Sequence, residues 1–184
     1  MPRPVPLCRL LLALLLAGTL LAGATACGSD DEGSGASGSA SPSATSSAQA
    51  QKWAKTRFVA NAGLAAGATY QWIVKPYRAG KFKKGADGRT LALVKAGLAG
   101  GFAYNRLTAA VDNAKGDPLL SKAVAPLTAG IASLKGLAAK VRNGDADAGD
   151  IGVFEDVISG VKDAGKSAGA EVKDKVPSTS QLGG

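Results

Sequence analysis

Histidine is absent from the chain, and the single methionine is Met1. Only two cysteines occur, Cys8 and Cys27, and aromatic side chains make up 5% of the residues. Catalytic triads need a histidine base, and zinc, copper and haem sites need histidine, methionine or several cysteine ligands, so this composition excludes those sites. We predict from it a protein that is not an enzyme and that holds no cofactor and no metal ion.

The first 26 residues have the pattern of a secretory signal. Arg3 and Arg9 precede an uncharged apolar stretch that ends in small residues, Leu10 to Ala26. A transmembrane helix is the alternative, but it needs about 20 apolar residues, whereas this stretch is shorter and contains two glycines. We therefore predict a signal peptide over residues 1–26 that is removed on export.

The signal ends in the residues ATAC, and Gly-Ser and acidic residues follow. This stretch resembles the lipobox of bacterial lipoproteins, in particular those of actinobacterial type, although leucine is the usual residue where Ala24 stands. The resemblance implies that Cys27 becomes the N-terminus and carries a diacylglyceryl thioether, which anchors the protein on the extracytoplasmic side of the cell membrane. Two acyl chains anchor stably, because each buried CH₂ contributes about 0.8 kcal/mol. The alternative is ordinary cleavage after Ala24 or Ala26, which leaves a free thiol in a secreted chain.

Composition divides the mature chain into three parts. Residues 27–47 are the lipidated cysteine and a flexible linker of Gly, Ser and Ala, which cannot form a core. Residues 48–175 have the length of one domain. Residues 176–184 are expected to be a frayed C-terminal tail.

Helical periodicity runs through residues 48–175. A first helix is expected over about residues 48–74, and in two later segments the apolar positions alternate in steps of three and four residues, which is the spacing of a helix seam. In the third segment these positions are Leu120, Val124, Leu127, Ile131, Leu134, Ala138 and Val141. In the fourth they are Ile151, Phe154, Ile158, Val161, Gly165, Ala168 and Val172. We predict an all-α domain, specifically an up-down-up-down four-helix bundle with close Ala/Gly packing.

The second predicted helix is apolar on two faces. One face carries Leu91, Val94, Leu98 and Phe102. The other carries Leu93, Gly97, Gly100, Tyr104, Leu107 and Val111. This helix is therefore expected to be the most buried of the four.

Prolines, a cap and spaced glycines refine the prediction. Pro76 is expected to end the first helix, because the residue before a proline avoids the α region. Asp117 is expected to cap the third helix, and Pro126 to kink it or split off its first turns. Glycines four residues apart are expected to let neighbouring elements pack closely, with self-association as the less favoured alternative. These pairs are Gly63 and Gly67, Gly97 and Gly101, and Gly165 and Gly169.

Basic residues gather between the first and second predicted helices, in the stretch KPYRAGKFKKGADGR. They are Lys75, Arg78, Lys81, Lys83, Lys84 and Arg89, and Asp87 is the one acid among them. Three interpretations stay open: a solvated loop, a binding site for envelope polyanions, or a contact with an anionic membrane surface, where each Lys or Arg contributes about 1 kcal/mol. The acidic loop with Asp145, Asp147 and Asp150 is expected at the same end. It lacks the glutamate that closes a calcium loop, so no calcium site is predicted.

The predicted function is that of a membrane-anchored, non-enzymatic binding or scaffolding module of the cell envelope. The first alternative is an electrostatic binder of envelope polyanions or of an anionic membrane surface through residues 75–89. The second is a small-ligand-binding or enzymatic bundle with a pocket between its helices. The expected partners are the bilayer, through acylated Cys27, and envelope polyanions or another envelope protein. Nucleic acid is not expected, and the domain is expected to be a monomer or a weak homo-oligomer.

Overall fold

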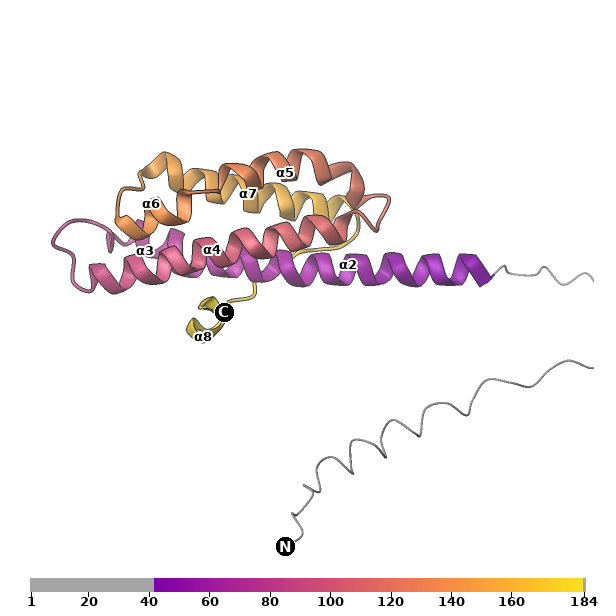
Figure 1. Ribbon diagram of the computed structural model, residues 1–184, viewed down its shortest axis with the longest axis horizontal. Coiled ribbons are helices and arrows are strands. Elements are labelled where there is room, and N and C mark those ends of the chain that lie inside the picture. Colours follow the sequence, from indigo (N-terminus) through magenta and orange to yellow (C-terminus); the bar gives the residue numbers. More distant parts are fainter. Residues whose placement is uncertain (1–41, 184) are drawn as a thin grey trace, which may run out of the picture. The chain divides into compact units, whose positions relative to one another are not determined.

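The computed structural model describes residues 42–183, with side chains from Ser47 onward. Helices are the regular structure in this range, which contains no strand (Figure 1), so the all-α prediction is confirmed for it. The elements are α2 Pro42–Thr69, η1 Tyr70–Val74, α3 Lys75–Arg78, α4 Arg89–Ala114, η2 Leu120–Ala123, α5 Val124–Ser133, α6 Leu137–Asn143, α7 Ala148–Ser167 and α8 Thr179–Leu182. The predicted signal peptide, Cys27 and most of the predicted linker lie outside the described residues.

The two long helices, α2 and α4, run side by side in opposite directions (Figure 1). Both bury faces that consist mainly of alanine. On α2 these residues are Ala54, Phe58, Ala62, Ala65, Ala66, Ala68 and Thr69. On α4 they are Leu93, Ala96, Ala99, Gly100, Ala103, Leu107, Ala110, Val111 and Ala114. Alanine favours helix formation, and short side chains let helix axes approach closely. Helix α2 begins at Pro42, inside the predicted linker.

The chain stays helical through Pro76, so the prediction that the first helix ends there is wrong. The π-helical turn η1 follows α2, and α3 then continues past the proline to Arg78. In η1 the Lys75 N–H bonds to the Tyr70 carbonyl, five residues back. The backbone hydrogen bonds have therefore already shifted from the regular α pattern just before Pro76. Because proline removes a donor at a point where the pattern is shifted, Pro76 disrupts the helix less than it would disrupt a regular α-helix.

The predicted third helix is divided into three parts. The 3₁₀ turn η2 precedes α5, and Pro126 stands in the first turn of α5, which confirms the predicted split. A second break, between α5 and α6, has no counterpart in the prediction; Gly136 has φ +90° there, a left-handed conformation that glycine adopts readily. Among the described residues, the stretch Leu120–Asn143 is long and apolar enough to cross a membrane by length and composition alone, with mean hydropathy 1.2.

The C-terminal residues 170–183 are packed onto the helices, in contrast to the frayed tail that the sequence predicts. The segment crosses α2 at two glycines: the Lys175 N–H donates to the Gly63 carbonyl at 2.8 Å, and a Cβ atom on Gly67 would overlap the backbone of the segment. Helix α8 then lies against α4, and Leu182 is buried. Local composition does not show this contact, because the partner glycines lie more than a hundred residues earlier.

Helix α4 exposes one of its two apolar faces. Leu91, Val94 and Leu98 are exposed, whereas Leu93 and Leu107 on the other face are buried. Helix α6 packs against that other face, at Gly97 and Gly100. The helix buries nine of its 26 residues, but one of its two predicted apolar faces is exposed.

Candidate functional site

The basic stretch forms an ordered turn at one end of the described domain. Lys75 and Arg78 lie on α3, Lys81, Lys83 and Lys84 lie in the loop that follows, and Arg89 is the first residue of α4. Phe82 holds this loop from within: it is buried, and its ring makes an edge contact with Tyr77 at a centroid distance of 6.0 Å. The aromatic residues of the stretch therefore fix the loop, instead of facing a ligand.

The two arginines of the stretch are bound to the protein itself. Arg78 forms an ion pair with Glu155 of α7. Arg89 donates from Nε to the Phe82 carbonyl at 2.9 Å, and its guanidinium lies against Gly144, at the end of α6. Partly exposed pairs of this kind contribute little to stability, but they fix the direction in which the loop runs. Both arginines are therefore positioning residues.

The four lysines differ from the arginines in having no protein partner. All are exposed, and none forms an ion pair with any residue that the structure describes. They are Lys75, Lys81, Lys83 and Lys84. This end of the domain therefore presents several ammonium groups to the solvent.

A cavity of about 350 Å³ opens between η1, α3, the loop and α4. Lys75, Lys81 and Lys95 line it together with Trp72, Leu91 and one acid, Asp87. Lys95 Nζ lies 5.4 Å from the centroid of the Trp72 ring, within reach of a cation–π interaction. An apolar wall with several ammonium groups beside it suits a ligand that combines an apolar part with negative charge.

Lys95 is the member of this site that the sequence prediction missed. It stands on α4, outside the basic stretch, and so the charge count along the chain does not single it out. Its position four residues after Leu91 is the available signal, because residues four apart share one face of a helix.

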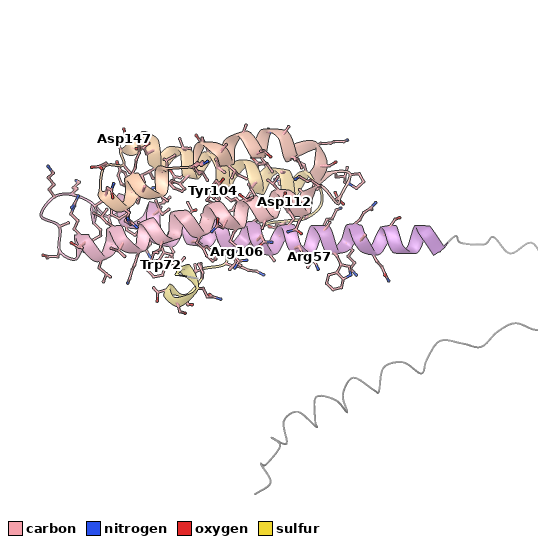
Figure 2. The ribbon with its side chains drawn as sticks, in the orientation of Figure 1. Arg57, Trp72, Tyr104, Arg106, Asp112 and Asp147 are labelled. Atoms are coloured by element: carbon pink, nitrogen blue, oxygen red, sulfur yellow. The ribbon has the colours of Figure 1, made fainter. Side chains whose placement is uncertain are left out.

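The acidic loop serves as the N-terminal cap of α7. The Asp150 N–H donates to Asp147 Oδ1 at 2.8 Å, and the Asp147 N–H donates to Asp150 Oδ2 at 3.2 Å. Hydrogen bonds from Lys140 and from the Asp147 backbone lower the pKa of Asp150 below its ordinary value of 3.8. Figure 2 shows Asp147 and Trp72 on opposite sides of the domain, so these carboxylates and the basic cavity occupy different faces. No three metal-ligating side chains gather among the side chains that the structure describes.

Two other features of the described domain resemble ligand sites in size or in sequence. A cavity of about 510 Å³ between α5 and α7 is lined largely by small and apolar side chains. Residues 160–167, GVKDAGKS, match the GxxxxGK[ST] phosphate-binding pattern, but they lie inside α7, and Gly165 packs against the C-terminal segment. A phosphate-binding loop joins a strand to a helix and has free backbone N–H groups, so this match is not a phosphate site.

The chain matches no protein-family model, no curated protein and no solved structure. The assignment of a function therefore rests on the residues of the chain itself.

Proposed function

We propose that the protein is an exported lipoprotein whose helical domain is a non-enzymatic binding or scaffolding module of the cell envelope. The signal-like residues 1–26 and the lipobox-like sequence before Cys27 support export and acylation. For the domain we propose the up-down-up-down four-helix arrangement, with α2, α4, the segments η2 to α6, and α7 as its four members. The opposite directions of α2 and α4 support this arrangement.

The binding chemistry that we propose is electrostatic, with an anionic partner at the basic end of the domain. One observation carries this proposal: four lysines of the stretch are exposed and unpaired among the described residues, while Arg78 and Arg89 hold the loop in place. Clustered charges of one sign raise the local concentration of an oppositely charged partner. Phosphate polymers of the envelope and anionic lipid head groups both offer this chemistry.

Co-sedimentation of the unlipidated chain, residues 28–184, with purified envelope fragments tests the proposal. The acyl anchor is left out because it would hold the chain on membranes by itself. We expect binding at low salt that weakens steeply as the salt concentration rises, since ion pairing with a polyanion releases counterions. Binding that does not respond to salt contradicts an electrostatic partner and indicates recognition of a helical face.

Matched lysine variants separate the basic loop from net charge. Changing Lys81, Lys83 and Lys84 to Gln is expected to weaken binding roughly 100-fold, at about 1 kcal/mol for each lysine. The control changes Lys52, Lys122 and Lys166 to Gln; all three are exposed, lie outside the stretch and form no ion pair with a described residue. The control should bind like the wild type. An equal loss in both variants shows that binding follows net charge and not the loop.

A further inference from the structure

The outward face of α4 carries apolar side chains that stay exposed between the cavity and α8. Leu91, Val94 and Leu98 are 59%, 43% and 41% exposed. They follow one another at steps of three and four residues, so their side chains share one face of the helix. Single exposed apolar side chains are ordinary on a protein surface, but a row of them on one helix face marks an interaction site.

This row continues into the basic cavity. Leu91 lines the cavity together with Lys75, Lys81 and Lys95, and the half-buried Trp72 lines it from η1. Farther along α4, Leu98 lines a second hollow, which Gln181 and Leu182 of α8 also line. An apolar face bordered by lysines and an indole ring has the composition of helices that lie in the interface of a membrane.

We propose that this surface docks onto a bilayer that contains anionic lipid. The surface, named the α4 face below, consists of Trp72, Lys75, Lys81, Leu91, Val94, Lys95 and Leu98. The lysines contact the phosphates of the lipid head groups, while the apolar side chains enter the boundary between head groups and acyl chains. The inference rests on the electrostatic binding in the proposed function and names anionic lipid as the partner.

The apolar row favours lipid over a soluble phosphate polymer. A polymer that binds by charge uses the lysines and leaves the row of apolar side chains in water, whereas a bilayer surface takes up both. Because the row runs along the first turns of α4, docking places this part of the helix parallel to the membrane plane. The domain then lies on the bilayer along its side, with the loop lysines at one end of the contact.

Vesicle binding with a tryptophan reporter tests the inference. The unlipidated chain 28–184 contains the whole compact unit of residues 40–184. The chain has two tryptophans, so Trp53→Phe leaves Trp72 as the sole reporter. With vesicles of phosphatidylcholine and phosphatidylglycerol, we expect sedimentation with the vesicles, a blue shift of the Trp72 emission, and quenching by brominated lipid. With phosphatidylcholine alone, we expect at least roughly tenfold weaker binding, because the lysines then meet no net negative charge.

A pair of leucine variants tests the apolar contribution. Leu91→Gln with Leu98→Gln should weaken binding to anionic vesicles roughly tenfold or more, because both side chains lose their burial in the lipid. Leu119→Gln with Val176→Gln is the control, since these residues are also 50% and 57% exposed but lie off the α4 face. All four positions are on the surface, so both variants should keep the helical circular dichroism and the melting temperature of the wild type.

The possible outcomes separate this inference from the proposed function. Weaker vesicle binding in the leucine variant alone, together with a shifted Trp72 emission, supports the α4 face. Equal vesicle binding by the leucine variant and the wild type overturns it, as does an unchanged Trp72 emission. Salt-sensitive binding to a glycerol-phosphate polymer without binding to vesicles overturns the inference and leaves the proposed function standing. Binding to neither overturns both.

Discussion

At the scale of the single residue, Gly67 is the point of closest approach between α2 and the C-terminal segment. A Cβ atom there would overlap the carbonyl group of Lys175 and the backbone nitrogen of Val176. Backbone atoms cannot move aside as a flexible side chain does, so we expect Gly67→Ala to lower the free energy of unfolding by about 1–3 kcal/mol. Urea denaturation followed by circular dichroism measures this change.

Gly152 is the matched control for that substitution. It lies within α7, and a Cβ atom at this position meets nothing within 4 Å. Gly152→Ala should therefore raise the free energy of unfolding by about 0.5–1 kcal/mol, because alanine loses less conformational freedom in a helix. If Gly67→Ala is as stable as Gly152→Ala, the C-terminal segment does not pack on α2 as described.

Asp150 gives the fold a dependence on acid. Its pKa lies below 3.8 in the folded protein, because of the hydrogen bonds from Lys140 and from the Asp147 backbone. A group whose pKa is lowered by folding contributes stability above its unfolded-state pKa and loses it as the pH falls through the folded-state pKa. We expect an NMR titration to place the pKa of Asp150 below 3.8, and Lys140→Gln to raise it toward that value. A wild-type pKa at or above 3.8 contradicts the bond to Lys140.

Local chemistry explains which single residues could be predicted. Asp117 caps the third helical segment as expected, because its Oδ1 accepts from the N–H groups of Leu119 and Leu120 at 2.9 and 3.0 Å. The glycine spacing correctly indicated a close approach at Gly63 and Gly67, since only glycine leaves that room, but it was wrong for Gly101 and Gly169, where a Cβ atom would meet nothing within 4 Å. The spacing could not name the partner, which is an extended segment from the far end of the chain.

At the scale of the element, the C-terminal segment contributes to the core. Val172 and Leu182 are buried, and Lys175 bonds to the Gly63 carbonyl. Deleting residues 171–184 should lower the free energy of unfolding by about 3–6 kcal/mol, at about 1.5–3 kcal/mol for each of the buried side chains of Val172 and Leu182, and it also removes the buried ring of Pro177. Deleting only Gly183 and Gly184 removes none of these side chains and serves as the control in the same urea titration. Equal stability of the two truncations would show that the segment is frayed in solution, as the sequence alone predicts.

The ends of helices were predictable where a single residue determines them. They were not predictable where the backbone hydrogen-bond pattern changes to accommodate a residue. The split before α5 follows from the ring of Pro126. Pro76 has the same ring, yet the helix continues, because the π-turn before it displaces the bonding pattern. The break at Gly136 depends on a left-handed backbone angle that a periodic apolar pattern does not reveal.

At the scale of the whole molecule, the sequence predicts the all-α class but not which face of α4 is covered. Both faces of that helix carry apolar residues at helical spacing, so periodicity predicts burial equally for either face. The covered face is the one that carries Gly97 and Gly100, where α6 approaches closely. The leucine-bearing face stayed outside, next to the cavity with Lys95. The loop lysines of the candidate site were therefore predictable, whereas Lys95 and the exposure of the leucine-bearing face were not.

In the proposed arrangement, the acyl anchor at Cys27 and the α4 face attach one chain to the same membrane, so each would raise the effective concentration of the other. In a bacterium that processes lipoproteins, we expect the wild-type chain to fractionate with membranes at every salt concentration, because the acyl chains do not respond to salt.

Cys27→Ala should stay with membranes at low salt and be released at high salt. Adding Leu91→Gln and Leu98→Gln to Cys27→Ala should release the chain already at low salt, while those leucine changes alone should leave the anchored chain on the membrane. Membrane fractionation with immunoblotting distinguishes these states. Retention of Cys27→Ala on membranes at high salt contradicts acylation as the anchor, and its release already at low salt contradicts the α4 face.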